Sequence, residues 1–297
     1  MTDDIELDYL KEWIGKTERQ SDFISEESAI QLAMTLDRAE VEFRTGDILP
    51  PLWHWIYFLP RLRLSELKSD GHGKLGQFLP PVKLPSRMWA GGKFKFLSDF
   101  QIGEEAEKCS VIKDVVPKKG RSGDLVFVEV EHTIKGSMGG SLIETQNIVY
   151  RDLEDKRKQV TSKSPIINIP QWKTEIVPNS MLLFRYSALT FNTHRIHYDR
   201  KYCMEEEGYE GLLVHAPLLA TLLIEKAIIE NPGLRLQSFQ FQAHSPVFDE
   251  KPFFVCGSKE KKNLDLWVLK SDGTVGMSAV ASASPEGRVS THKVSPI

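Results

Sequence analysis

The apolar run "LLFRYSALT" is followed closely by four side chains that can transfer protons or form hydrogen bonds. They are Asn192, His194, His197 and Asp199. Histidine is the side chain whose ordinary pKa lies nearest neutral pH, so His197 is a candidate for moving a proton in a reaction. Asn192 cannot act as a base, but its amide can hold a water molecule or fix a carbonyl group. The alternative is that the histidines lie at the surface or cap a helix and take part in no reaction.

The segment before these residues, "SMLLFRYSAL", is expected to form a strand, because apolar and aromatic residues dominate it. Its alternation ends at Thr190, so residues 192–197 would lie in the connection that leaves a sheet. Polar groups that a rigid scaffold holds at such a place are common components of functional sites.

A second stretch, "EGLLVHAPLLATLL", predicts the start of a long buried helix. Pro217 suits the first helical position, which makes Ala216 the expected cap. The backbone N–H groups there have no partner within the helix, and the positive end of the helix dipole lies beside them. Such an N–H group can stabilise a developing oxyanion. The alternative is that this helix end binds only water and that its leucines are simply core.

Together these residues suggest one reaction. The Ala216 N–H would polarise the carbonyl of a thioester or a similar group, His197 would move a proton, and Asn192 would position a water molecule. The sequence therefore favours addition of water across an activated double bond, or the reverse reaction.

The elements that would position these residues form two similar series. A helix is predicted from Ser25 over "SEESAIQLAMTLDRA". Each half of the chain then contains four strand-like runs, headed by the pairs Phe94/Phe96 and Phe239/Phe241. The eight runs cover residues 92–100, 105–116, 124–134, 142–152, 235–244, 251–259, 263–271 and 275–284.

This weak repeat predicts an α+β fold of two units, each with an antiparallel sheet around a long helix. The two sheets would join side by side, which would also remove exposed edge strands. We expect an N-terminal domain over residues 1–152, a polar and basic linker over 153–175, and a C-terminal catalytic domain over 176–297.

Composition excludes several classes of protein. The formal net charge of −3 argues against a nucleic-acid surface. Three scattered cysteines show no metal-ligand spacing and no disulfide framework, which favours a reducing compartment. The acidic N-terminal stretch lacks the features of a signal peptide, and no run is long and apolar enough to span a membrane. We therefore expect a cytoplasmic protein with no membrane or nucleic-acid partner and no metal, and a homodimer is compatible with the sequence.

The motifs resemble those of the MaoC-like, hydratase-type-2 group of hot-dog proteins. In that group an Asp-x-Asn-Pro-(aliphatic)-His element precedes a His-x-Asp pair, a Gly-(aromatic) pair and a His-Gly pair. The corresponding residues here are 192–197, Asp199, Gly208-Tyr209 and His215-Ala216. The stretches "FRYSALTFNTHRIHYD", "GYEGLLVHAPLLATLL", "LPSRMWAGG" and "RSGDLVFVEVEH" are similar to a two-hot-dog subgroup of 3-methylfumaryl-CoA hydratases and 3-hydroxyacyl-thioester dehydratases.

This resemblance implies a double hot-dog fold and a hydro-lyase that acts on an acyl-CoA, with coenzyme A as part of the substrate and no separate cofactor. It makes His197 the catalytic histidine. Asn192 stands where the family has an acid and would orient the water, while Ala216 replaces a glycine and keeps its N–H. The N-terminal half has no equivalent of residues 192–197, and His54 and His72 lie in unrelated contexts. We therefore expect one active site per chain, with a degenerate N-terminal unit that shapes the substrate tunnel.

Other residues near the motif are expected to bind the substrate. Arg195 could pair with a carboxylate of the acyl group, although a solvated arginine is an equal alternative. The other substrate-binding candidates are His194, Asp199, His215 and Tyr186. The leading function is hydration of a short, branched, dicarboxylic 2-enoyl-CoA such as 3-methylfumaryl-CoA. The alternatives are a 3-hydroxyacyl dehydratase that acts on an acyl-carrier protein, a hot-dog thioesterase, and a non-catalytic acyl-CoA-binding protein.

Overall fold

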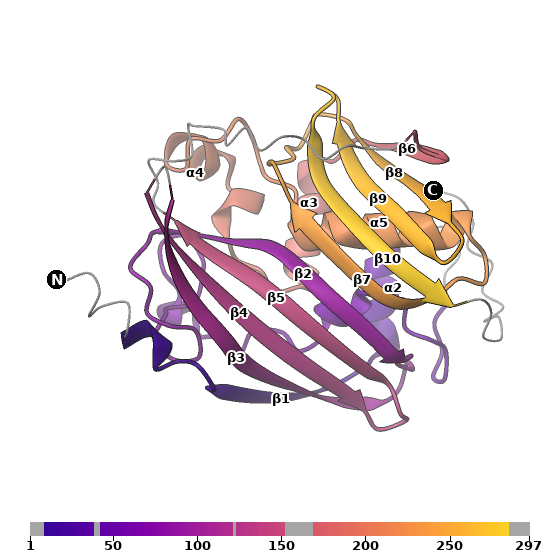
Figure 1. Ribbon diagram of the computed structural model, residues 1–297, viewed down its shortest axis with the longest axis horizontal. Helices are drawn as coiled ribbons and strands as arrows, with labels where there is room; N and C mark the ends of the chain where they lie inside the picture. The colour runs from indigo at the N-terminus through magenta and orange to yellow at the C-terminus, as the bar shows by residue number, and fades with distance from the viewer. Residues whose placement is uncertain (1–8, 39–41, 121–122, 152–168, 285–297) are drawn as a thin grey trace.

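The strands of the protein form one antiparallel sheet (Figure 1). The computed structural model describes residues 9–38, 42–120, 123–151 and 169–284. Across the sheet the strands run in the order β1-β3-β4-β5-β2-β7-β10-β9-β8-β6. Their bounds are β1 Thr17–Phe23, β2 Ser86–Ser98, β3 Glu105–Gly120, β4 Gly123–Gly136, β5 Ser141–Arg151, β6 Trp172–Ile176, β7 Arg235–Ala243, β8 Phe253–Glu260, β9 Asn263–Lys270 and β10 Val275–Ser284.

The strand order confirms the half-chain repeat. Strands β3-β4-β5-β2 on one side mirror β8-β9-β10-β7 on the other, and β2 pairs with β7 where the two halves meet. In this pairing Phe94 lies opposite Phe239, and Gly92 lies opposite Phe241. All eight predicted strand runs are strands, and the two sheets join edge to edge as expected.

Glycine permits the close approach of β2 and β7. A Cβ atom at Gly91 would lie 2.7 Å from the carbonyl oxygen of Phe241, nearer than a real Cβ atom can come. Next to the glycines, Trp89, Phe94, Phe239 and Phe241 pack in edge-on and stacked contacts, with ring centroids 5.6 to 6.2 Å apart. The seam between the two halves is therefore part of the aromatic core.

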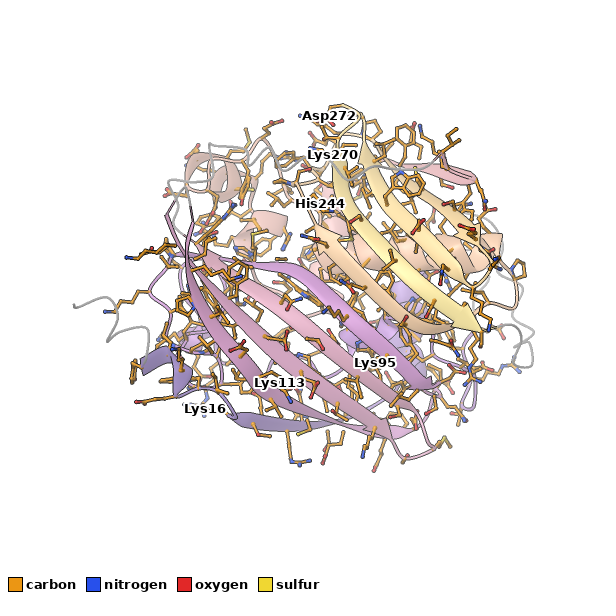
Figure 2. All side chains as sticks on the ribbon, in the orientation of Figure 1. Lys16, Lys95, Lys113, His244, Lys270 and Asp272 are labelled. Atoms are coloured by element: carbon orange, nitrogen blue, oxygen red, sulfur yellow. The ribbon has the colours of Figure 1, made fainter. Side chains whose placement is uncertain are left out.

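The helices cover one face of the sheet (Figure 1). On β2 the buried Phe94 alternates with the exposed Lys93 and Lys95, as a half-buried strand requires. Lys95 and Lys113 lie on the face that the helices leave open (Figure 2). The helices are α2 Glu26–Thr35, α3 Ser180–Leu189, α4 Arg200–Glu205 and α5 Ala216–Glu230, with short 3-10 helices η1 Trp53–Ile56, η2 Leu64–Glu66 and η4 Arg195–His197.

The two halves differ in their helices. The C-terminal half holds α5, which is buried on nearly all sides against β8, β9 and β10. The N-terminal half holds α2, which Ser25 caps as predicted, and the single turn η1. Proline precedes η1, and Leu52 and Phe58 on either side of it have positive φ angles, so the backbone cannot continue as a helix there. Of the described helices, none is long and apolar enough to cross a membrane.

A buried polar contact joins the two halves on the face of the sheet that the helices cover. Glu225 of α5, which is 1% exposed, accepts a hydrogen bond from Trp53 Nε1 at 2.9 Å and forms an ion pair with Arg38. Burial lowers the pKa of Arg38 to about 10. Because a buried charge is costly when unpaired, this contact fixes η1 and the end of α2 against α5.

The segment 180–189 is a helix, and our prediction of a strand was wrong. Asn179 caps α3 by accepting a hydrogen bond from the Leu182 N–H. The buried residues are Leu183, Tyr186 and Ser187, spaced three and four apart as on one face of a helix. Met181 and Phe184 are exposed. The apolar residues that suggested a buried strand are therefore divided between the buried face and the exposed face of a helix.

The expected linker over 153–175 extends too far. Its first part lies outside the described residues, but β6 begins at Trp172 and pairs with β8 at the edge of the sheet. The last residues of the linker therefore belong to the C-terminal sheet, held by backbone hydrogen bonds and by Trp172 packing over Gly257.

Candidate active site

Four histidine rings lie in a row where the two halves of the chain meet. The His72 ring is tilted by 41° against that of His194, with centroids 3.9 Å apart. His194 meets His197 edge-on at 5.6 Å, and His197 stacks on His215 at 3.7 Å. His72 comes from the N-terminal half, η4 and its cap supply the next two, and His215 precedes α5. The structure thus brings three of the predicted site residues together and adds a fourth histidine.

His197 is oriented for proton transfer. Its Nδ1 lies 2.8 Å from the carbonyl oxygen of Leu213. A carbonyl oxygen can only accept, so Nδ1 carries the hydrogen and Nε2 keeps a free lone pair. Burial lowers the pKa of His197 to about 4, although the bond to Leu213 acts in the opposite direction. The side chain is therefore a neutral imidazole at neutral pH, with Nε2 able to accept a proton.

The pH dependence of turnover follows from this depressed pKa. Because the base must be neutral, kcat/KM should stay level from neutral pH down to about pH 5 and fall only as His197 gains a proton near pH 4. A pH profile of kcat/KM from 4 to 8, on enzyme shown to stay folded by circular dichroism, checks this. An acid limb centred near 6.5, the ordinary pKa of histidine, would contradict the assignment.

The buried ring of His215 stacks on the ring of His197. It is 1% exposed, its Nε2 shares a 2.8 Å hydrogen bond with Ser187 Oγ, and its Nδ1 is buried without a partner. Burial lowers its pKa well below the ordinary value, so the ring is neutral. Tyr186 lies against it with ring centroids 5.0 Å apart, and burial raises the pKa of that phenol. His215 and Tyr186, which we expected to bind substrate, are both buried, and substrate binding by them stays a prediction.

Helix α5 starts one residue earlier than the sequence predicted. Its cap is His215, and Ala216 is the first helical residue, because Pro217 is accommodated within the first turn. The first backbone N–H of α5 that bonds within the helix is that of Leu219, which donates to the carbonyl of His215. The Ala216 N–H therefore remains at the positive end of the helix dipole, next to the stacked histidines, as the oxyanion prediction requires.

Asn192 lies on the tight turn that follows α3. Its Oδ1 accepts a hydrogen bond from the His194 N–H at 3.0 Å, and its own N–H donates to the Ser187 carbonyl at 2.8 Å. The amide oxygen thus shapes the turn that places His194 and His197, which leaves the Nδ2 hydrogens for a water molecule. Whether they hold the attacking water remains a prediction.

Arg195 holds the loop together, so it does not offer a free guanidinium to a substrate. It forms a 2.8 Å ion pair with Asp199 and donates to the Ser69 carbonyl at 3.1 Å. Its guanidinium also lies 4.0 Å over the ring of Tyr202. Asp199, the other expected substrate-binding residue, additionally caps α4 through the Tyr202 N–H. Both candidates are committed to the local structure, because the spacing of four residues pairs them with each other.

The loop around His72 is the part of the site that the sequence did not reveal. His72 Nδ1 lies 3.3 Å from Asp70, and burial, aided by the charge of Arg87, lowers the pKa of His72 to about 4. The Gly71 carbonyl accepts a 2.6 Å hydrogen bond from Thr193 Oγ1. The Asp70 carbonyl accepts one from the Arg195 N–H at 3.0 Å. His72 was judged to lie in an unrelated context, and that was wrong, because its ring lies against that of His194. Nothing in the sequence indicated this contact, because Gly71 and Thr193 are 122 positions apart in the chain.

Replacing Gly71 with alanine should impair both folding and turnover. Gly71 has a φ of +89°, and a Cβ atom there would lie 1.7 Å from the Thr193 carbonyl oxygen, so the two loops would have to separate. Gly139→Ala is the matched control, because its φ is +101° but a Cβ atom would meet nothing within 4 Å. Melting temperature and kcat of both variants are the measurements. Equal losses in the two variants would mean that the loop contact does not hold the site.

Despite the row of histidines, the described residues include no group of three or more His, Cys, Asp or Glu side chains that could hold a metal ion.

The sequence is similar to those of known proteins. The family model for hydroxyacyl-thioester dehydratase type 2 matches residues 52–249, about two thirds of the chain. The chain belongs to the hydroxyacyl-thioester dehydratase type 2 family. It is 42% identical to the mesaconyl-C(4)-CoA hydratase of Chloroflexus aurantiacus over 270 residues, which cover 90% of this chain and 95% of that protein. It is also 27% identical to the mitochondrial hydroxyacyl-thioester dehydratase type 2 of Schizosaccharomyces pombe, over 83% and 91% of the two chains.

Solved structures confirm the double hot-dog fold of this family member. A MaoC-like dehydratase from Phytophthora capsici superposes with a TM-score of 0.64 at 12% identity, over 95% of this chain and 99% of that one. A Mycobacterium tuberculosis protein described as a double hot-dog fold superposes with a TM-score of 0.55 at 12% identity, over 91% and 96%. The long helix of the fold is α5 here, and in the first unit α2 and η1 lie on the corresponding face of the sheet.

The family assignment agrees with the resemblance of the motifs, and it makes the protein a hydro-lyase of the enoyl-thioester hydratase and hydroxyacyl-thioester dehydratase type. The chemistry of such an enzyme requires a base for water and a group that stabilises a carbonyl oxygen. The Nε2 lone pair of His197 and the first N–H groups of α5 are suited to these two tasks.

Proposed function

We propose that the protein reversibly adds water to a 2-enoyl-CoA thioester and that its substrate is a short, branched, dicarboxylic acyl-CoA such as 3-methylfumaryl-CoA, which gives citramalyl-CoA. The 42% identity to the Chloroflexus mesaconyl-C(4)-CoA hydratase, over nearly the full length of both chains, is the observation that carries this proposal. The position of His197, neutral and with Nε2 free, supports a catalytic role.

The mechanism uses three groups of the chain. His197 Nε2 takes a proton from a water molecule that the Asn192 amide holds, and the water oxygen bonds to C3 of the acyl group. The electrons of the C2–C3 double bond move toward the thioester carbonyl, whose oxygen accepts a hydrogen bond from the Ala216 N–H. The His197 imidazolium then returns its proton to C2, so that one water is added and the histidine is restored. Dehydration follows the same steps in reverse.

The second candidate function is dehydration of a straight-chain 3-hydroxyacyl thioester carried by an acyl-carrier protein. The 27% identity to the fission-yeast hydroxyacyl-thioester dehydratase favours it, but this identity is lower and the match covers less of both chains. The named yeast relative is mitochondrial and the Chloroflexus relative is bacterial. A cytoplasmic location therefore remains a prediction.

A direct assay separates the two candidates. The purified protein is mixed with 3-methylfumaryl-CoA, with 2-butenoyl-CoA, and with a long-chain 2-enoyl thioester of acyl-carrier protein, and the loss of conjugated enoyl absorbance is followed. We expect the highest kcat/KM for 3-methylfumaryl-CoA. A preference for the long-chain carrier-protein substrate would favour the second function, and no hydration of any of the three would overturn the assignment.

A further inference from the structure

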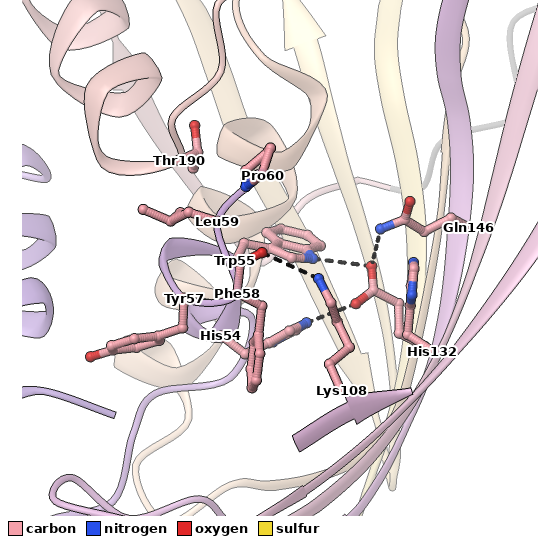
Figure 3. A pocket seen from close by; sticks show the side chains of 11 residues that line it. His54, Trp55, Tyr57, Phe58, Leu59, Pro60, Lys108, His132, Gln146 and Thr190 are labelled. Carbon is pink, nitrogen blue, oxygen red and sulfur yellow. Dashed lines mark hydrogen bonds and ion pairs between the residues drawn. The ribbon is translucent and has the colours of Figure 1, made fainter. Parts of the chain in front are cut away.

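A small cavity is lined mainly by residues of the N-terminal half, with Thr190 from the end of α3 (Figure 3). It encloses about 80 Å³, which is room for a carboxylate group or two to three water molecules. Charged and polar side chains occupy one side of it. The lining residues are His54, Trp55, Tyr57, Phe58, Leu59, Pro60, Lys108, His132, Glu144, Gln146 and Thr190.

Glu144 in this cavity is fully committed as an acceptor. Its carboxylate, 1% exposed, accepts from His54 Nε2 at 2.9 Å, Trp55 Nε1 at 3.1 Å and Gln146 Nε2 at 2.8 Å. Burial alone would raise the pKa of Glu144. The hydrogen bonds to its carboxylate outweigh burial and lower the pKa to about 2, and His54 makes the largest of these contributions. Glu144 is therefore ionised at neutral pH and too weak a base to take part in hydration. The pair with His54 is no second catalytic centre of the kind formed by His197.

Lys108 is the charge in the cavity with unused bonding capacity. Its Nζ donates one long hydrogen bond, to the Phe58 carbonyl at 3.4 Å, and lies 5.3 Å from the Phe58 ring. Within the described part of the chain it has no carboxylate within 4.0 Å. Burial lowers its pKa, so the ammonium is held in a partly dehydrated position. Figure 3 shows the side chain reaching from β3 toward His54 and Trp55. An ammonium with two free hydrogens in such a place can stabilise an anionic ligand.

A second side chain in the cavity has an atom without a hydrogen-bond partner. His132, which is buried, bonds to Ser110 Oγ through Nδ1 at 2.8 Å, and its Nε2 has no hydrogen-bond partner. A buried polar atom of this kind needs a partner, such as a ligand or a water molecule. Because the Glu144 carboxylate is already bonded to His54, Trp55 and Gln146, Lys108 Nζ and His132 Nε2 are the groups of the cavity that can donate to a ligand.

The cavity adjoins the loop that carries the catalytic candidates. Thr190, one of its lining residues, ends α3 and lies two residues before Asn192, which limits the distance between their Cα atoms to about 7.6 Å. Thr190 Oγ1 also donates to the Tyr186 carbonyl at 2.7 Å, and the Tyr186 ring packs on His215. The cavity therefore borders the end of α3, which leads directly into the loop of Asn192 and His197.

We propose that the cavity binds the distal carboxylate of a dicarboxylic acyl group and that Lys108 is its counter-ion, an inference that rests on the proposed function. In 3-methylfumaryl-CoA the carboxylate is bonded to C3, the carbon that water attacks, so its binding site must adjoin the catalytic residues. Thr190, which lines the cavity and lies two residues before Asn192, supplies that link. The small volume of the cavity also excludes a long alkyl chain. The N-terminal half then selects the substrate, although it carries no catalytic group.

Substitution of Lys108 tests this inference. Lys108→Met keeps the length of the side chain and removes the charge, and Lys108→Gln serves as a second variant in case methionine disturbs folding. The control is Lys113→Met, on the same strand, because the Lys113 side chain is 46% exposed and lies on the open face of the sheet (Figure 2). For each protein kcat/KM is measured with 3-methylfumaryl-CoA and with the neutral 2-butenoyl-CoA, and thermal unfolding shows that the fold is kept.

The ratio of the two kcat/KM values is the quantity that decides. We expect it to fall about 10- to 100-fold in both Lys108 variants, the loss expected for a charged hydrogen bond, and to stay within about two-fold of wild type in Lys113→Met. An unchanged ratio in folded Lys108 variants would overturn the inference while leaving the hydratase function intact. If the wild-type protein hydrates neither thioester, the proposed function fails, and this inference fails with it.

Discussion

Replacing His197 with alanine should lower kcat about 100- to 10,000-fold while the chain still folds, the loss expected when a general acid–base is removed. The reason lies in the geometry: Nδ1 is bound to the Leu213 carbonyl, and Nε2 is left to take and return the proton. Steady-state kinetics with the preferred 2-enoyl-CoA, together with circular dichroism, measures the effect. Because alanine leaves a gap against His215, His197→Asn should be prepared as well, since it keeps much of the volume and cannot act as a base.

His244→Ala is the matched control for this experiment. His244 follows β7 (Figure 2), and its Nε2 lies 2.7 Å from Ser278 Oγ of β10. Its loss should leave kcat within about two-fold of wild type, as expected for substitutions remote from the site. Folded His197 variants with near-normal turnover would show that the proton is moved by another residue.

Replacing Asn192 with alanine should lower kcat about 10- to 100-fold with a smaller effect on KM, because the proposed contact with water strengthens only in the transition state. Asn192→Asp should be the best tolerated substitution, since a carboxylate can still accept the hydrogen bond from the His194 N–H that shapes the turn. Pre-steady-state kinetics on the three proteins separates binding from chemistry.

The pH profiles of these proteins provide an independent readout. Wild type should show the single ionisation of His197, because asparagine does not titrate, whereas Asn192→Asp should add a second ionisation. If Asn192→Ala has no kinetic effect, the water must be held by another group, and the Nδ2 hydrogens of Asn192 have no part in the reaction.

Much of the fold could be predicted because it depends on local patterns. Alternation along β2 and the aromatic pairs within β2 and β7 are visible in the sequence, and so are the strands and the repeat. The segment 180–189 was misread because Met181 and Phe184 are apolar yet exposed, so periodicity gave no clear helical face. The cap residue Asn179 and the proline before it were the signals that favoured a helix there.

The candidate site was predictable only in part, because some of its contacts join residues that are far apart in the sequence. His194, His197 and His215 were found because a motif of closely spaced residues carries them. His72 and Ser187 escaped notice because their contacts with the site join distant parts of the chain, such as the 28 residues between Ser187 and His215. The charge of Arg195 suggested substrate binding, but the structure pairs it with Asp199 and the loop at Ser69. The tasks of such residues depend on tertiary contacts, which spacing alone cannot reveal.

The most direct test of the central claim follows the water itself. The protein is incubated with 3-methylfumaryl-CoA in water enriched in oxygen-18, and the product is examined by mass spectrometry. We predict an intact CoA thioester that is heavier than the substrate by one molecule of labelled water, with the label in a new hydroxyl group at C3, and we predict that His197→Ala forms it far more slowly. Release of free coenzyme A with label in a carboxylate would instead indicate thioester hydrolysis, and unchanged substrate would indicate binding without catalysis; either result would contradict the proposed hydration.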